Sequence, residues 1–145
     1  MTMAISRTLR EKITVEAEYR CGYCLTDQRV SGAQMHIEHI IPQVKGGSSE
    51  ESNLWLACAW CNSFKGTQTE ATDPQTGQQA PLFNPRQQNW FEHFTWSTDG
   101  LWIIGLTPIG RATVAALRLN NEYIIPARRY WVLAGWHPLG QKDRV

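Results

Sequence analysis

CGYC at residues 21–24 and CAWCN at residues 58–62 flank the run HIEHIIP at residues 36–42. Each flanking segment carries a Cys-x-x-Cys pair, and two such pairs are a common ligand set for tetrahedral zinc. Four thiolates leave no open coordination position, so we expect a structural zinc that is not itself a catalyst. The alternative is a disulfide framework, which is typical of secreted proteins. The four predicted zinc ligands are Cys21, Cys24, Cys58 and Cys61.

The segment between the cysteine pairs predicts a strand, a loop, a second strand and then a short helix. The strands are expected at Gln34–Ile40 and Leu54–Ala57, joined by a polar loop at residues 45–52 whose two glycines permit a backbone reversal. A helix is expected at Ala59–Lys65, with Gly66 in the C-cap position. The residues with ligand chemistry therefore lie at the two ends of this unit.

The flanking sequence predicts one helix before this unit, and a hairpin and two helices after it. Ser6 is a candidate N-cap, because its hydroxyl can accept a hydrogen bond from the first turn of a helix. Asp99-Gly100 is a favoured hairpin turn. The expected elements are a helix at residues 6–19, a turn at 73–77, a return strand at 101–104, and helices at 107–119 and 126–133.

The composition is that of an ordinary globular protein. The chain has 145 residues, of which 42% are hydrophobic and 19% charged, so we expect one domain over residues 1–145. The formal net charge of +1 argues against a protein that coats nucleic acid by bulk electrostatics. Acidic residues predominate in the middle of the chain, which suits a divalent metal, and basic residues in the C-terminal third, which suits phosphate.

Hydropathy gives no sign of a membrane protein. No stretch reaches the roughly 18 to 20 apolar residues that span a bilayer, and the N-terminus has no secretory apolar core. We therefore expect no membrane partner and a cytoplasmic location. In that reducing environment, Cys-x-x-Cys pairs favour metal binding over disulfides.

Glu38 and His39 form the centre of a second candidate site. Glu38 offers a hard oxygen to a divalent ion, and His39, with a reference pKa of about 6.5, can take a proton from water near neutral pH. Asn62, directly after the last cysteine, offers a side-chain oxygen that the zinc-bound backbone is expected to place opposite Glu38. Asn53, at the end of the loop, is expected to bind backbone groups and so fix the loop and the imidazole.

His36 and Lys65 are secondary candidates. His36 alternates with Glu38 along the expected strand, so both side chains are expected on one face, near the metal or the phosphate. The alternative for His36 is a packed or surface histidine. Lys65 lies one turn after the last cysteine and is a candidate phosphate contact. Its alternative is a lysine at a helix C-terminus that the helix dipole favours.

Taken in order, these residues resemble the HNH endonuclease family, in its subgroup with four zinc-binding cysteines. The resemblance covers residues 21–66, under a third of the chain, and it is the ordered set that is specific. The last HNH position is Asn62 instead of histidine, and the acidic residue before His39 is glutamate instead of the commoner aspartate. The matching positions are Cys21, Cys24, Glu38-His39-Ile40-Ile41-Pro42, Gly46-Gly47, Asn53-Leu54, Cys58, Cys61-Asn62 and Lys65.

The resemblance implies a ββα-metal (His-Me finger) fold and metal-dependent hydrolysis of phosphodiester bonds in DNA. It assigns His39 as the general base that activates water. Glu38 and Asn62 become the ligands of Mg²⁺, Mn²⁺ or a similar ion, which stabilises charge on the phosphate and the leaving group. Asn53 becomes the residue that orients the loop and His39.

These inferences predict an α+β protein with a zinc-stabilised ββα core at residues 21–66. An N-terminal helix precedes the core, and a C-terminal extension at residues 67–145 holds a β-hairpin and helices. The predicted function is that of an HNH endonuclease acting on DNA. The alternative from another class is a noncatalytic zinc module that binds nucleic acid or a protein partner. RNA and branched DNA stay open as substrates, and no segment predicts self-association.

Overall fold

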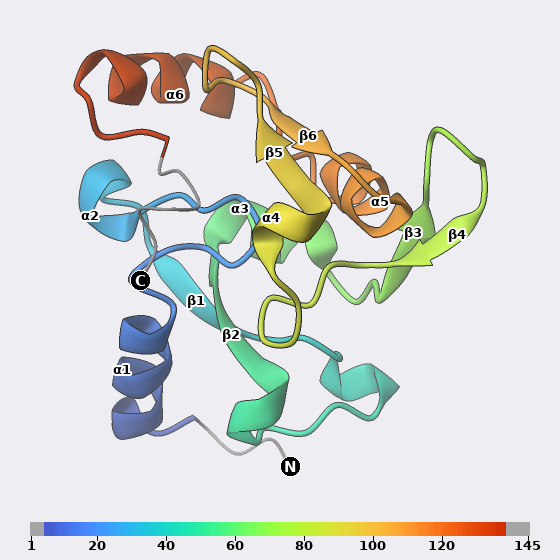
Figure 1. Cartoon of the computed structure of the whole chain (residues 1–145). Helices are drawn as coiled ribbons and strands as arrows, with labels where there is room; N and C mark the ends of the chain where they lie inside the picture. Colours follow the sequence, from blue (N-terminus) through green and yellow to red (C-terminus); the bar gives the residue numbers. More distant parts are fainter. Residues whose placement is uncertain (1–4, 139–145) are drawn as a thin grey trace. The chain divides into compact units, whose positions relative to one another are not determined.

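The computed structural model describes residues 5–138 (Figure 1). The chain divides into two compact units, which are described separately. The first contains Met1–Thr69 and Asn84–Gln88, and the second contains Glu70–Phe83 and Asn89–Val145. The expectation of one domain over residues 1–145 stays a prediction. The mixture of short helices and two-stranded antiparallel sheets agrees with the predicted α+β class.

Helix α1 (Arg7–Glu16) opens the first unit. The Ser6 hydroxyl accepts a 3.1 Å hydrogen bond from the backbone N–H three residues later, as expected for an N-cap. The helix ends before the predicted Tyr19, because Glu18 and Tyr19 adopt left-handed φ angles of 57° and 62°. Helix α2 (Gln28–Ser31), which was not predicted, follows the first cysteine pair.

Strands β1 (Met35–His39) and β2 (Leu54–Cys58) form an antiparallel pair, and helix α3 (Ala59–Lys65) follows β2 directly. Helix α3 packs against both strands (Figure 1). Gly66 ends α3 with a positive φ of 54°, a conformation that glycine adopts without steric penalty. The predicted order of strand, loop, strand and helix is therefore confirmed.

The connection between β1 and β2 contains two short 3₁₀ helices, η1 (Gln43–Lys45) and η2 (Glu51–Asn53). The predicted glycine-dependent reversal lies between them. Gly46 has a φ of +89°, and a Cβ at Gly47 would lie 1.7 Å from the Ile41 carbonyl oxygen. Glycine is thus required at Gly46 for its backbone angle, and at Gly47 because the backbone of Ile41 approaches too closely for a side chain.

The second unit contains two antiparallel hairpins and short helices. Its core includes the buried side chains of Phe83, Phe94 and Ile103. The predicted turn at Asp73–Gly77 is confirmed, because the Gly77 N–H donates a 2.8 Å hydrogen bond to the Asp73 carbonyl. The elements are β3 (Glu70–Thr72) paired with β4 (Gln79–Pro81), α4 (Trp90–His93), β5 (Phe94–Trp96) paired with β6 (Ile103–Gly105), α5 (Pro108–Ala116) and α6 (Ile124–Leu133).

Several boundaries in the second unit differ from the prediction. Helix α5 ends three residues before the predicted Leu119, because Arg118 adopts a positive φ of 49°. The return strand starts at Ile103, two residues later than predicted. Helix α6 starts at Ile124, two residues earlier than predicted, since Pro126 is tolerated in the first turn of a helix. Helix α4 was not predicted.

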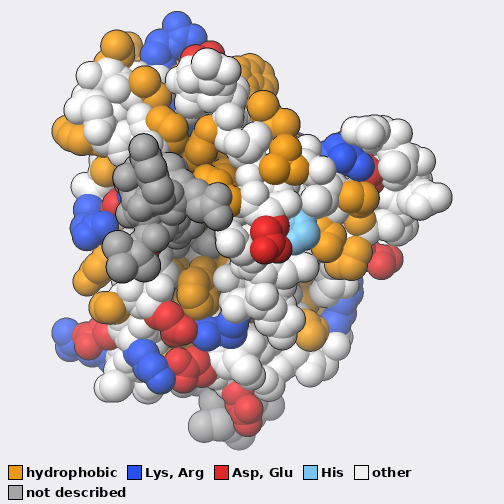
Figure 2. Space-filling model, viewed as in Figure 1, with side chains coloured by type: hydrophobic (Ala, Val, Ile, Leu, Met, Phe, Trp, Pro, Cys, Tyr) orange, Lys and Arg blue, Asp and Glu red, His pale blue; other side chains and the backbone are white. Residues whose placement is uncertain are grey.

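The face of the molecule in Figure 2 carries charged side chains of both signs. On the face in Figure 2, Lys and Arg side chains alternate with Asp and Glu side chains and form no continuous basic patch. This agrees with the formal net charge of +1. Among the described residues, no helix has the length and the apolar character needed to cross a membrane.

Candidate metal centre and adjoining pocket

The four cysteine thiols lie together in the first unit. Their sulfur atoms are all within 4.8 Å of one another, and all four residues are buried. The Sγ atoms of Cys24 and Cys58 are 3.7 Å apart, which matches the edge, roughly 3.8 Å, of a tetrahedron with Zn–S bonds of about 2.3 Å. All four thiols are free, so the cysteines form no disulfide framework. The cluster therefore fits a structural metal such as zinc.

The CGYC turn is anchored to β2. The Gly22 N–H donates a 2.9 Å hydrogen bond to the Leu56 carbonyl oxygen. A Cβ at Gly22 would lie 2.4 Å from the Cδ1 atom of Trp55, so a larger residue would displace the indole. On the other side of the cluster, Cys58 ends β2, and its Sγ accepts a 3.4 Å hydrogen bond from the Cys61 N–H. The two halves of the cluster thus meet at one end of the hairpin.

The environment of the thiols favours a bound cation. Burial raises the pKa of the Cys21 thiol well above its usual value. Hydrogen bonds from Cys21 and Cys58 instead lower the pKa of the Cys24 thiol. Protein groups alone therefore do not hold all four sulfur atoms as thiolates in this buried space. A metal ion bound by the four cysteines would supply the missing positive charge and favour loss of the thiol protons.

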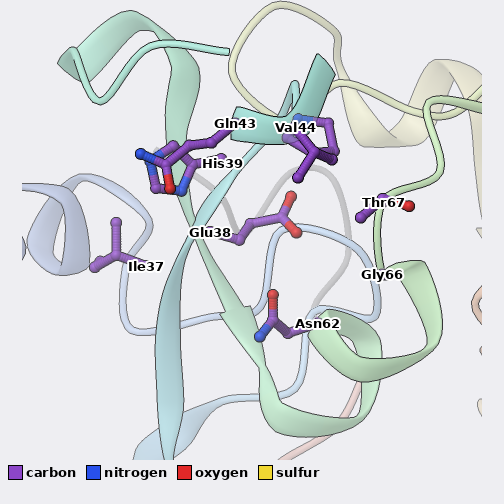
Figure 3. Close-up of a pocket in the computed structure, with 9 residues that line it drawn as sticks. Ile37, Glu38, His39, Gln43, Val44, Asn62, Gly66 and Thr67 are labelled. Atoms are coloured by element: carbon purple, nitrogen blue, oxygen red, sulfur yellow. The ribbon is translucent and has the colours of Figure 1, made fainter. Parts of the chain in front are cut away.

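A pocket of about 330 Å³ opens beside the ββα unit (Figure 3). Its walls come from β1, from the start of the β1–β2 loop, and from the end of α3 with the residues that follow. Three of the four predicted catalytic residues line it, namely Glu38, His39 and Asn62. Figure 3 shows the side-chain oxygen of Asn62 pointing toward the Glu38 carboxylate. Glu38, His39 and Asn62 thus all line the pocket, but only the carboxylate and the amide oxygen point toward each other; the His39 ring lies on the other side of β1, beside Gln43.

Glu38 is buried, with 4% of its surface exposed. The Tyr23 hydroxyl donates a hydrogen bond to Oε1 of Glu38, and the Lys65 ammonium nitrogen lies 3.8 Å from Oε2. Burial raises the pKa of Glu38, whereas Lys65 and Tyr23 act in the opposite direction because they stabilise the carboxylate. The carboxylate is thus held by one group from the CGYC turn and one from α3.

Lys65, predicted as a phosphate contact or as a helix C-terminal lysine favoured by the dipole, lies inside the fold. Its surface is 2% exposed, and its Nζ donates hydrogen bonds of 2.9 Å to the Ile40 carbonyl and 3.3 Å to the His39 carbonyl. The last turn of α3 packs on β1, which directs the aliphatic stem inward. Its ammonium group then satisfies carbonyl oxygens at the end of the strand.

The imidazole of His39 contacts Ser49. Its Nε2 lies 2.9 Å from the Ser49 Oγ, and the Gln43 side-chain amide donates a 3.2 Å hydrogen bond to the same hydroxyl. Burial lowers the pKa of His39, and the positive charge of Lys65 lowers it further. The imidazole is therefore neutral at neutral pH, which is the form that accepts a proton from water.

Asn53 holds the β1–β2 loop through three hydrogen bonds. Its Oδ1 accepts from the Ile41 N–H at 2.9 Å, and its Nδ2 donates to the carbonyl oxygens of Ile41 at 3.0 Å and Ser48 at 2.8 Å. Ser48 directly precedes Ser49, the partner of His39. Asn53 thus orients the loop directly and the imidazole only through the loop.

Residues 21–68 match the family model described as HNH endonuclease. This segment is similar to HNH endonucleases. The match covers about a third of the chain and confirms the predicted resemblance. It contains all four cysteines and every residue that lines the pocket. The comparisons with curated proteins and with solved structures gave no significant match. An HNH segment with a four-cysteine cluster indicates a nuclease or nucleic-acid-binding role, with nucleic acid as the partner.

Within the HNH segment, His36 stands apart from the other predicted site residues. It lies on β1 opposite Ala57, is half-buried, and is not among the residues that line the pocket. His36 and Glu38 share a face of the strand by alternation, but two residues span roughly 6.6 Å of strand. A shared face therefore did not bring both side chains to one pocket.

Two residues of the HNH segment contact the predicted site without having been predicted. Tyr23 lies between two zinc ligands, and a buried tyrosine hydroxyl normally has a hydrogen-bond partner, so its place in the CGYC turn was a usable indication. Ser49 lies in a loop that also contains Ser48 and Ser52. Nothing in the sequence distinguishes Ser49 from these neighbours, because its contact with His39 depends on the path of the whole loop.

Proposed function

We propose that this protein is a metal-dependent endonuclease that hydrolyses phosphodiester bonds in DNA. The observation that carries the proposal is the pocket that His39, Glu38 and Asn62 all line. A noncatalytic zinc module needs the cysteines, but it has no use for a neutral imidazole beside a carboxylate that faces an amide oxygen. The pocket chemistry therefore favours catalysis over binding alone.

His39 acts in this proposal as the general base. Its neutral imidazole takes one proton from a water molecule, whose oxygen attacks the phosphorus atom while the bond to the leaving 3′ oxygen breaks. The leaving oxygen takes a proton from solvent, which completes the hydrolysis. Ser49, and the loop that Asn53 fixes, keep the imidazole in place for this step.

Glu38 and Asn62 are the protein ligands of a Mg²⁺ or Mn²⁺ ion in this proposal. A carboxylate and an amide oxygen are hard donors that suit such ions, and both face the same pocket (Figure 3). When bound, the ion stabilises the negative charge on the phosphate and on the leaving oxygen. The four cysteines hold a separate structural zinc that keeps the CGYC turn, β2 and α3 together.

The proposal is tested by incubating supercoiled plasmid DNA with the zinc-loaded protein and Mg²⁺ or Mn²⁺. We expect nicked or linear DNA with one of these ions and intact DNA when a chelator removes it. His39→Ala should lower the rate by about 10² to 10⁴-fold, as expected for loss of a general base. His36→Ala, on the same strand but outside the pocket, is the matched control and should keep most of the activity.

The same assay separates this proposal from its alternatives. Full activity in His39→Ala would remove His39 as the base. Binding of DNA without cleavage under either ion would favour a noncatalytic zinc module. Parallel reactions with single-stranded RNA and branched DNA test the substrate class, since faster cleavage of either would keep the hydrolytic mechanism and replace linear DNA as the substrate.

A further inference from the structure

The charge balance of the pocket is set by two buried groups. Glu38 is the only acidic residue among the described residues that line the pocket. The Lys65 ammonium nitrogen lies 3.8 Å from its Oε2, and both side chains are almost fully buried. Asn62, the second proposed ligand, carries no charge. The formal charge of the carboxylate and the ammonium together is therefore zero.

Lys65 is held in this position and cannot move into solvent at low cost. Its Nζ donates to the carbonyl oxygens of Ile40 and His39 at 2.9 Å and 3.3 Å, so leaving would strand two buried acceptors. The carboxylate is fixed from the other side, because Tyr23 donates to Oε1. A carboxylate offers about four lone-pair positions, so room for an ion remains, but the nearby positive charge remains as well.

Hard divalent ions bind weakly to such an arrangement. Mg²⁺ and Mn²⁺ give up hydration water in exchange for anionic oxygens, and Mg²⁺ commonly combines one or two carboxylates with phosphates of the substrate. An ammonium group close to the same carboxylate repels the ion, most strongly where water is excluded. A phosphate oxygen of bound DNA would supply the negative charge that Lys65 offsets.

We propose that Lys65 is an internal cation that neutralises Glu38 and makes divalent-ion binding in the pocket depend on a nucleic-acid phosphate. This inference rests on the proposed function. The inference adds an order of binding to that function. The pocket binds the divalent ion together with DNA and binds little of the ion before DNA arrives. Lys65 thereby acts as a positioning residue that sets when the ion binds, without touching the substrate.

The test measures Mn²⁺ binding, by the electron paramagnetic resonance signal of free Mn²⁺, to the zinc-loaded full chain carrying His39→Ala, so that DNA stays intact. Each titration is run with and without a short DNA duplex, and Mn²⁺ held by DNA alone is subtracted. We expect DNA to strengthen Mn²⁺ binding by roughly tenfold or more. Equal affinity with and without DNA would overturn the inference, and this arm needs no change at Lys65.

A second arm adds Lys65→Gln, whose amide can still donate to a carbonyl but carries no charge. Without DNA, this variant should bind Mn²⁺ roughly tenfold more tightly than its parent, and the gain from DNA should shrink. Arg10→Gln removes one positive charge from an exposed position of α1, away from the pocket, and should change neither value. Zinc content and circular dichroism establish that the variants are folded. Folded Lys65→Gln with the Mn²⁺ affinity of its parent would overturn the inference.

Failure of the inference and failure of the proposed function give different results. In one outcome, the wild-type protein nicks DNA but its His39→Ala form binds Mn²⁺ equally well with and without DNA. This outcome would refute the role of Lys65 and would not affect the proposed nuclease function. Wild-type protein that never nicks, while Mn²⁺ binding still depends on DNA and on Lys65, would refute the nuclease and support the ion-binding order.

Discussion

The Tyr23 hydroxyl donates a hydrogen bond to Oε1 of Glu38, and this contact joins the zinc-binding turn to the pocket. Tyr23 lies between two cysteines of the metal centre, and Glu38 lies on β1 beside the predicted base. The two candidate sites therefore share a buried hydrogen bond.

Tyr23→Phe should keep zinc but weaken the pocket. Loss of the hydroxyl leaves a buried carboxylate oxygen without its donor, which should lower the free energy of unfolding by about 1 to 3 kcal/mol. The nicking rate should fall because Glu38 is no longer held on that side. Zinc analysis, urea unfolding and plasmid nicking check these expectations. Tyr19→Phe is the control, since its ring contact with Arg29 does not need the hydroxyl. Unchanged stability and rate in Tyr23→Phe would contradict the prediction.

Cys61→Ser should remove zinc and unfold the first unit. Zinc binding in small modules contributes on the order of 10 kcal/mol, much of it as folding free energy. We expect loss of zinc by atomic absorption, lower solubility and loss of the cooperative thermal transition. Ser63→Ala, at an exposed position of the same helix, is the control. A soluble, active, zinc-free Cys61→Ser protein would show that the cluster has no structural role.

Asn53→Ala should loosen the β1–β2 loop. The substitution removes three hydrogen bonds in the loop, and each contributes about 0.5 to 1.5 kcal/mol, so the free energy of unfolding should fall by about 1 to 3 kcal/mol. The nicking rate should fall as well, because Ser49 no longer holds the imidazole of His39 in place. Ser52→Ala, an exposed neighbour, should change neither quantity. Nicking at the wild-type rate would mean that the loop does not orient His39.

Nicking should persist below the ordinary pKa of histidine. The pKa of His39 is lowered by burial and by Lys65, and the neutral imidazole is the active form. Activity is therefore full above about pH 6.5, the unperturbed value, and is lost only as the pH falls through the lowered pKa. The unfolded chain binds this proton more readily, so the same residue makes stability rise with pH across that interval.

Initial nicking rates at saturating Mn²⁺, measured from about pH 5 to pH 8, check this expectation. Lys65→Gln removes one of the two causes of the lowered pKa, so its acid limb should move to higher pH. Arg10→Gln, at an exposed position of α1, is the control for a general change in charge. An acid limb centred at or above about pH 6.5 in the wild-type protein would contradict the assignment of His39 as a partly buried base.

The metal centre and the order of elements around it could be predicted because they depend on local chemistry. Two Cys-x-x-Cys pairs specify their own geometry, and Gly46 and Gly47 mark a reversal that other residues cannot make. The alternation of side chains on a strand was not sufficient by itself to predict which residues line the pocket. It placed His36 on the face of Glu38, but the pocket is closed by α3 and the loop, which reach Glu38 and not His36.

The buried partners of the site could not be predicted from the sequence. Lys65 has the expected place on α3, but its direction depends on how that helix packs against β1. Ser49 meets His39 because Asn53 fixes the loop between them. These contacts join residues separated by 10 positions for Ser49 and His39 and by 25 or 26 positions for Lys65 and the β1 carbonyls, and no local pattern specifies such contacts.

The register of the hairpin limits the insertions and deletions that β1 can tolerate. Glu38 pairs with Trp55 across the two strands, and side chains alternate faces at every residue. One extra residue inserted in β1 before Glu38 would turn its carboxylate to the opposite side of the ribbon, while the four sulfur atoms stayed where they are. Such a protein would fold, carry its metal and be catalytically silent, so single-residue length changes in this strand should be far more damaging than most replacements of one amino acid by another.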